Sequence, residues 1–502
     1  MDARNGVQGC SISVSRLWVS LALGFVLVGC SDIQEQAPIS HLTVQDDFAR
    51  EVLERKEGAN YCKPEGLIKD SCCDFKTVDD LNQEILPDLN KLLETPFFSH
   101  FKLNLHKTCP FWNANELCSK VDCKVSTLDR SEVPEPWLPD DPLGSINFEP
   151  IPFGSKKTER CTFTDKDFCV LEDEESLDGE YVNLLKNPER FTGYAGDSSA
   201  KVWRSIYEEN CFGILNNLNG DNLFLNSDNT NNVCSEKRIF YRIVSGLHAS
   251  ISTHICDQYF NSTSGQWERN LECFVSRVGS FPDRLENMYF DYVILLRAIT
   301  KVSRYLKNYS YCGSEPEQDK LIKKHLARIS KTTRSCPDTF DEKALFQGDD
   351  AKSLKTQFKE HFRNITRVMD CIGCQKCRLW GKIQTGGVGT ALKILFSYEE
   401  KSLNPKKNPN LFQKTEIVAL LNTFGRLSES IAAVERFREL YQKRQSMEYT
   451  PGFKDKALEM FISTRDAIVK RSVAWADLLC ERIPALKLYR QMLRSSFKPL
   501  GF

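Results

Sequence analysis

Three cysteines, Cys371, Cys374 and Cys377, follow one another at intervals of three residues, and Lys376 and Arg378 stand beside them. Residues three apart lie on one face of a helix, so Cys374 and Cys377 can approach closely enough to bond. Neighbouring cations favour the thiolate, which is the reactive form of cysteine. The pattern therefore predicts a redox centre.

Other chemistries that use this spacing fit less well. A zinc site needs a second pair of ligands at a suitable spacing. A ferredoxin-type cluster needs a fourth cysteine and a proline, where this chain has Gly381 and Lys382. A thioredoxin-type motif follows a strand, whereas residues 354–369 show helical spacing of apolar side chains. We expect no metal, and structural disulfides remain the alternative.

The cysteine content indicates where the protein works. The chain has 502 residues, 20 cysteines and a net charge of −1. Disulfides persist in oxidising compartments, so we expect a protein of the secretory pathway. The balanced charge gives no indication of a nucleic-acid partner.

The first 30 residues have the features of a signal peptide. Arg4 and Arg16 precede an apolar run from Leu17 to Gly29, which is short for a membrane span. Cleavage after Cys30 would leave an even number of cysteines; an uncleaved anchor is the alternative, and a bacterial lipoprotein signal ranks lower. We expect three regions: signal residues 1–30, a main domain over 31–445 and a helical extension over 446–502.

Three sequons suit a glycosylated luminal or secreted protein, although each alone is a weak signal. They begin at Asn261, Asn308 and Asn364.

Apolar residues recur at helical spacing along most of the chain, and no strong alternating pattern indicates strands. The pattern predicts a mainly α fold. The helical segments are residues 78–105, a stretch from 236 onward, 284–306, 354–369, 390–396 and 415–441.

A proline-rich stretch interrupts this pattern between residues 134 and 152. Such proline density excludes a helix and indicates a loop. Cys118 and Cys123 lie just before this loop. A cysteine pair at the edge of a mobile loop can move, which a buried structural pair cannot.

Five motifs in order resemble the endoplasmic reticulum oxidoreductins, the flavin-dependent thiol oxidases of the secretory pathway. The resemblance extends from about residue 61 to about residue 441. The motifs are Cys-Pro-Phe-Trp at 109–112, Asn-Pro-Glu-Arg-Phe-Thr-Gly-Tyr at 187–194, Tyr-Glu-Glu-Asn-Cys at 207–211, Ser-Gly-Leu-His-Ala-Ser-Ile at 245–251, and the stretch from 370 to 396.

The resemblance implies a single large helical domain with FAD among its core helices, and an electron path. Reduced protein disulfide isomerase delivers electrons to a shuttle pair, Cys118 and Cys123, which passes them to the inner pair, Cys374 and Cys377. Cys374 receives the shuttle attack, and Cys377 lies nearer the flavin. FAD then reduces oxygen to hydrogen peroxide. We expect a monomer in the endoplasmic reticulum lumen, associated with the luminal face of the membrane.

The resemblance also implies which residues contact the flavin. Arginines suit the pyrophosphate, and Trp203 and His248 can stack on or hydrogen-bond the rings. From helical spacing alone, His248 would be a structural residue. The implied contacts are Arg190, Thr192, Tyr194, Trp203, Ser245, His248, Arg284 and Arg297.

Two structural disulfides are implied in the same way: Cys109 with Cys371, and Cys211 with Cys234. The chain departs from the animal enzymes because no cysteine stands five residues after Cys123. One regulatory bond of the animal type is therefore unavailable. Cys161 can pair with Cys118 or with Cys169, and both pairings stay open.

The leading hypothesis is an FAD-dependent thiol oxidase that drives disulfide formation. The alternative is a non-enzymatic, disulfide-rich luminal or secreted binding protein, in which the three spaced cysteines form a structural knot. The environment of Cys374 and Cys377 distinguishes the two hypotheses, because a knot needs neither a mobile second pair nor a flavin site.

Overall fold

The computed structural model describes residues 65–113, 119–134, 167–172, 179–210, 235–311, 315–333, 339–409 and 411–446. The expected signal peptide and the extension from residue 447 onward lie outside the described residues. So do Cys118, Cys161, Cys211 and Cys234.

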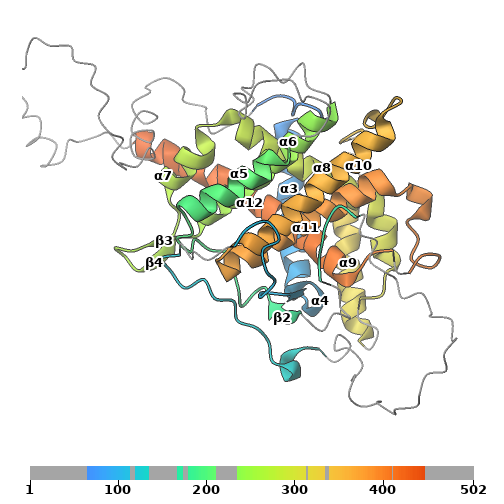
Figure 1. Ribbon diagram of the computed structural model, residues 1–502, viewed down its shortest axis with the longest axis horizontal. Coiled ribbons are helices and arrows are strands. Elements are labelled where there is room, and N and C mark those ends of the chain that lie inside the picture. The colour runs from blue at the N-terminus through green and yellow to red at the C-terminus, as the bar shows by residue number, and fades with distance from the viewer. Residues whose placement is uncertain are drawn as a thin grey trace, which may run out of the picture. The chain divides into compact units, whose positions relative to one another are not determined.

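Helices make up most of the described chain, which confirms the mainly α prediction (Figure 1). The longer helices are α3 (Phe75–Leu93), α5 (Asp197–Glu208), α6 (Ser235–Asp257), α8 (Pro282–Asn308), α9 (Pro316–Thr333), α10 (Ala351–Val368), α11 (Gln375–Ser397) and α12 (Lys414–Ser446). Short helices are α4 (Pro96–Ser99), α7 (Leu271–Phe274), a π-helical turn at Val275–Gly279, and 3₁₀ turns at Arg130–Glu132, Glu342–Ala344, Met369–Cys371 and Glu400–Ser402.

Helix α3 is shorter than the sequence pattern predicts. It begins after Asp74, whose carboxylate accepts a hydrogen bond from the Thr77 amide at 2.6 Å. The predicted helix over residues 78–105 is correct only as far as Leu93. Proline disfavours helical backbone in the residue before it, so Thr95 before Pro96 is extended, and the chain continues into α4 and a strand.

The two small sheets are antiparallel pairs. β1 (His100–Leu103) pairs with β2 (Glu180–Asn183), with His100 opposite Asn183. An isolated bridge between Thr127 and Val182 attaches the segment that follows Cys123 to the same sheet. β3 (Tyr259–Asn261) and β4 (Gln266–Glu268) form a hairpin after α6.

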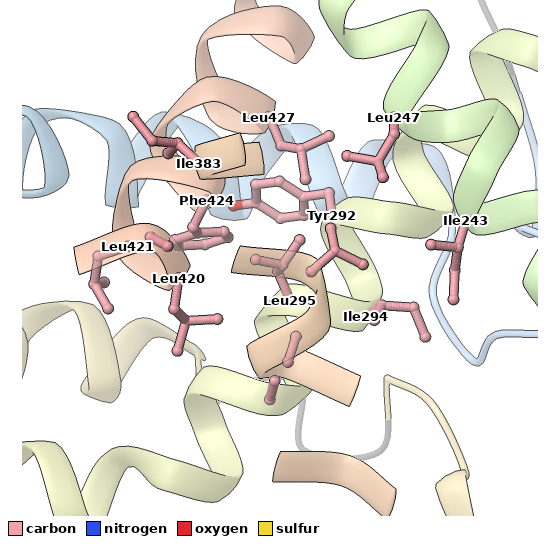
Figure 2. Close-up of a cluster of buried hydrophobic side chains, with 14 of the residues drawn as sticks. Ile243, Leu247, Tyr292, Ile294, Leu295, Ile383, Leu420, Leu421, Phe424 and Leu427 are labelled. Atoms are coloured by element: carbon pink, nitrogen blue, oxygen red, sulfur yellow. The ribbon is translucent and has the colours of Figure 1, made fainter. Parts of the chain in front are cut away.

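The core is made by α6, α8, α11 and α12, whose apolar side chains meet in one cluster (Figure 2). Leu247, Tyr292, Ile383 and Phe424 represent the four helices, and each is at most 4% exposed. Within the described part, residues 414–444 are long and apolar enough to cross a membrane. However, 83% of their most apolar window is buried in the protein, as in a core helix.

Helix α11 is buried on all sides from Leu379 to Phe396. The sequence pattern predicts a helix only over residues 390–396, whereas α11 begins at Gln375. Its glycines interrupt the apolar pattern because they lie at close helix contacts. A Cβ added at Gly387 would lie 2.4 Å from the Ala419 carbonyl oxygen of α12. This helix positions the predicted redox cysteines, because they lie at its N-terminal end.

We expect Gly387→Ala to lower the free energy of unfolding by about 1–3 kcal/mol, since the new methyl group meets backbone that cannot rotate away. Gly381→Ala is the matched control on the same helix. Its Cβ would meet the end of the flexible Met369 side chain, so the loss should be smaller. Urea unfolding of flavin-free protein measures both, and equal losses would contradict the close-contact explanation.

Candidate active site

The first turn of α11 holds two cysteines side by side. Cys374 is the N-cap residue, and its Sγ accepts a hydrogen bond from the Cys377 amide at 3.3 Å. Thr192 Oγ1 lies 3.4 Å from Cys374 Sγ and 3.3 Å from Cys377 Sγ. One hydroxyl therefore touches both sulfurs of the predicted inner pair.

The two thiols differ in acidity. Hydrogen bonds from Cys377, Thr192 and Cys123 outweigh burial and lower the pKa of Cys374 to about 7. The pKa of Cys377 is raised, because its thiol donates to Cys374 and is buried. In the dithiol state the negative charge therefore lies on Cys374, at the positive end of the helix dipole.

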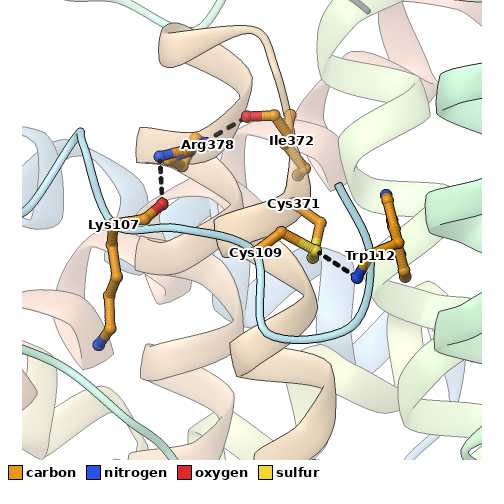
Figure 3. The surroundings of a disulfide bond; sticks show 6 residues. All are labelled: Lys107, Cys109, Trp112, Cys371, Ile372 and Arg378. Atoms are coloured by element: carbon orange, nitrogen blue, oxygen red, sulfur yellow. Dashed lines mark hydrogen bonds between the residues drawn. A yellow bond between two sulfur atoms is a disulfide. The ribbon is translucent and has the colours of Figure 1, made fainter. Parts of the chain in front are cut away.

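A disulfide anchors the segment just before this turn. Cys109 and Cys371 are bonded (Figure 3), with an S–S distance of 2.05 Å, which confirms the pairing that the resemblance implies. Beside it, Arg378 donates to the carbonyl oxygens of Ile372 at 3.1 Å and Lys107 at 3.2 Å. These contacts fix the N-terminal end of α11 against residues 105–112.

Cys123 lies against the inner pair. It is 7% exposed, and its thiol is within hydrogen-bonding range of Cys374. Its carbonyl oxygen accepts from the Lys376 amide at 3.0 Å. The segment from residue 119 to residue 126 thus reaches the first turn of α11, although Cys118 lies outside the described residues.

Beside Cys377, a partly enclosed cavity opens among α5, α6, α10 and α11. Its wall is mainly apolar, with a few polar groups, as expected for a cofactor or small-molecule site. Cys377 lines it and Cys374 does not. The pair therefore lies between Cys123 and the cavity.

Four of the eight expected flavin contacts line this cavity: Arg190, Thr192, Tyr194 and Trp203. A polar cluster next to Trp203 contains three others: Ser245, His248 and Arg284. His248 stacks on Trp203 with ring centroids 3.7 Å apart, and its Nδ1 lies 2.9 Å from the Tyr207 hydroxyl. The Tyr207 hydroxyl also bonds Ser245.

His248 is neutral at physiological pH. Burial, with the cations Arg284 and Arg277 nearby, lowers its pKa to about 3. The ring can therefore stack or exchange hydrogen bonds without carrying charge.

Arg297 stays a prediction. It does not line the cavity, and its guanidinium is held by Glu342, with Nε 2.9 Å and Nη2 3.0 Å from the carboxylate oxygens. It borders a different, polar surface pocket on α8. Besides Arg190, the cavity wall contains Arg277, in the π-helical turn, whose carbonyl accepts from Arg284 Nη1 at 2.8 Å.

Among the charged residues of the cavity wall, sequence reasoning missed Arg277 and Glu189. Arg277 belongs to none of the matching motifs, and its only signal is a position seven residues before Arg284. Glu189 stands inside a matching motif next to Arg190, so the motif could have indicated it.

Glu189 is a buried carboxylate on the cavity wall. Gln384 Nε2 donates to both of its oxygens at 3.1 Å, and Arg426 Nε lies 3.7 Å away. Burial raises its pKa to about 7. Its negative charge in turn contributes to the raised pKa of Cys377.

A second disulfide, which the sequence analysis did not assign, joins Cys256 to Cys273. It connects the end of α6 to α7, directly before the turn that carries Arg277. Cys169 is buried, and Cys161, which can pair with Cys169 or with Cys118, lies outside the described residues, so both pairings stay open.

Of the three sequons, Asn308 is exposed at the end of α8, whereas Asn261 and Asn364 are half-buried. Asn364 Nδ2 donates to Glu209 at 3.2 Å. Among the described residues, no cluster of three His, Cys, Asp or Glu side chains could hold a metal ion.

Comparison with known sequences agrees with this architecture. A profile of the family Endoplasmic Reticulum Oxidoreductin 1 (ERO1) matches residues 84–434. Endoplasmic reticulum oxidoreductin-1 of Neurospora crassa is 38% identical over 461 residues, covering 76% of this chain and 69% of the relative. The Arabidopsis thaliana protein of that name is 40% identical over 389 residues, covering 74% and 80%.

Solved structures give the same result. A double-cysteine mutant of Saccharomyces cerevisiae Ero1p is 34% identical and aligns with a TM-score of 0.53, covering 74% of this chain and 99% of that one. A second structure, of Ero1p described as a source of disulfide bonds for oxidative protein folding, aligns with a TM-score of 0.51 at 34% identity and equal coverage. The chain therefore belongs to the endoplasmic reticulum oxidoreductin family and is a disulfide-forming thiol oxidoreductase of the endoplasmic reticulum.

Proposed function

We propose that this protein oxidises a reduced protein disulfide isomerase and passes the electrons to oxygen, giving hydrogen peroxide. The path runs through Cys118 and Cys123, then Cys374 and Cys377, then FAD bound in the cavity. The observation that carries the proposal is the position of the inner pair, with Cys374 facing Cys123 and Cys377 facing the cavity. Association with the luminal face of the membrane remains part of the proposal.

The cavity residues suit FAD. Arg190 and Arg277 offer positive charge for a pyrophosphate, and Trp203, backed by neutral His248, offers a stacking surface. The apolar wall would exclude water from the reacting sulfur. When bound, FAD would supply a two-electron acceptor that hands electrons on to oxygen, chemistry that side chains alone do not provide.

Thiol–disulfide exchange accounts for transfer into the site. A Cys123 thiolate would attack the Cys374 sulfur of the inner disulfide, and Cys377 would leave as a thiolate. Cys118 would then attack Cys123, restore the shuttle disulfide and release Cys374 as a thiolate. The low pKa of Cys374 makes it a good leaving group in this second exchange.

The first experiment is an absorbance spectrum of the purified protein before and after adding reduced protein disulfide isomerase. We expect a flavin spectrum that bleaches and recovers in air. Cys374→Ala and Cys377→Ala should keep the flavin and abolish bleaching, while Cys118→Ala should block the isomerase but leave slow oxidation of small thiols. A colourless, folded protein would overturn the proposal in favour of a disulfide-rich binding protein.

The positions of two arginines predict a difference between two variants. Arg277→Ala should weaken flavin binding about 10- to 100-fold, since hydrogen bonds to charged groups contribute about 1.5–3 kcal/mol. Arg297→Ala should weaken it less, because Glu342 holds its guanidinium outside the cavity wall. Flavin titration of the stripped proteins measures both, and the reverse order would make Arg297 the stronger flavin contact.

Glu189 should raise the pKa of Cys377. In flavin-free protein carrying Cys374→Ser, the rate of Cys377 alkylation follows the thiolate fraction. Adding Glu189→Gln removes a buried negative charge, so the alkylation midpoint should move to lower pH. Glu208→Gln, which changes an exposed carboxylate on α5, is the control. An unchanged midpoint in Glu189→Gln would show that Glu189 does not act on this thiol.

A further inference from the structure

Residues 119–126, which we name the shuttle segment, are held by backbone contacts on two sides. The amides of Lys120 and Val121 both donate to the Thr192 carbonyl oxygen at 3.0 Å. On the other side, the Cys123 carbonyl accepts from the Lys376 amide at 3.0 Å, and the Val125 amide donates to Gln375 Oε1 at 3.1 Å. Cys123 is thus fixed between residue 192 and the first turn of α11.

Thr192 contacts the inner pair as well as the shuttle segment. Its carbonyl holds the shuttle segment, while its hydroxyl lies 3.4 Å from Cys374 Sγ and 3.3 Å from Cys377 Sγ. A shift of this one residue would change the position of the shuttle segment relative to both sulfurs. The geometry that exchange requires therefore depends on a single short stretch of backbone.

The next residue, Gly193, lets the shuttle segment come this close. Its φ is +77°, and an added Cβ would lie 2.7 Å from Lys120 Cβ and 2.8 Å from the Lys120 amide nitrogen. Contacts this short do not occur, and the amide nitrogen is backbone that cannot rotate away. Any side chain at residue 193 would push the shuttle segment off its site.

We propose that Thr192 and Gly193 form a docking latch that positions Cys123 against Cys374, with Gly193 as the positioning residue for electron transfer between the two cysteine pairs. The inference rests on the proposed function and deepens it, because it names the contact that permits the first exchange. In that exchange the Cys123–Cys374 bond forms, the Cys374–Cys377 bond breaks, and Cys377 takes the electron pair. Without the latch, Cys123 remains able to accept electrons from a partner but does not reach Cys374.

A matched control exists three residues away. Gly196 also has a positive φ, +81°, and an added Cβ would meet nothing within 4 Å. Gly193→Ala and Gly196→Ala therefore both place a side chain at a positive φ, but only Gly193→Ala collides with the shuttle segment. A difference between the two variants in the rate of Cys123–Cys374 bond formation therefore reports on docking of the shuttle segment.

The test uses the full chain with Cys118→Ala and Cys377→Ala, which leave Cys123 and Cys374 to bond with each other. Oxidised glutathione takes up the two electrons, and mass spectrometry of the linked peptides follows the Cys123–Cys374 disulfide. We expect Gly193→Ala to slow this bond at least tenfold, and Gly196→Ala to leave its rate within twofold of the parent. Equal rates in both variants would overturn the latch.

If Gly193→Ala does not fold, as judged by circular dichroism, Lys120→Pro replaces it. This change, at an exposed residue of the shuttle segment, removes one of the two amides that donate to the Thr192 carbonyl, and it should slow formation of the Cys123–Cys374 bond. An unchanged rate would overturn the latch. Neither readout needs flavin or a disulfide isomerase. Failure of the unsubstituted protein to oxidise the isomerase would therefore count against the proposed function and not against the latch.

Discussion

The complete burial of α11 is the constraint on which the active site depends. Most helices of a globular protein expose one face, but α11 is covered on every side by α8, α10, α12 and the stretch near Leu171. Glycines allow these neighbours to approach, and Gly387 marks the tightest contact with α12. A helix held this firmly gives its first turn a fixed position. The two proposed redox cysteines would need such a position, because exchange between sulfurs requires a defined geometry.

A cluster of buried ion pairs lies beside the first turn of α11. Lys382 of α11 is 2% exposed and lies 2.6 Å from Asp370 and 3.1 Å from Glu172. Desolvation makes such a cluster a weak source of net stability, yet breaking it would leave an uncompensated buried charge. Asp370 precedes Cys371, so the ion pair and the Cys109–Cys371 disulfide hold adjacent residues of the same turn. We infer that their common effect is to set the orientation of the inner pair.

The inner pair separates two environments. Cys374 faces a polypeptide segment that is held by hydrogen bonds, and Cys377 faces a partly enclosed, mainly apolar cavity. The acidity of the two thiols follows this division, with the thiolate favoured at Cys374 and the proton retained at Cys377. Residues 189–194 border both environments. Glu189, Arg190, Thr192 and Tyr194 belong to the cavity wall, while Thr192 and Gly193 contact the shuttle segment. One short motif therefore supplies residues to both the proposed flavin site and the proposed shuttle contact.

The sequence by itself determined the helical class, because periodicity is a local property, and its resemblance to a family implied the Cys109–Cys371 link. It did not reveal that α11 begins at Gln375, since glycines at buried helix crossings resemble breaks in the apolar pattern. Nor did it indicate that Arg277 lines the cavity. Arg277 lies in a short π-helical turn outside every matching motif, and only tertiary packing brings that turn to the cavity wall. The latch at Gly193 was likewise decided by tertiary structure, because it depends on backbone atoms more than 70 residues apart in sequence that no local pattern relates.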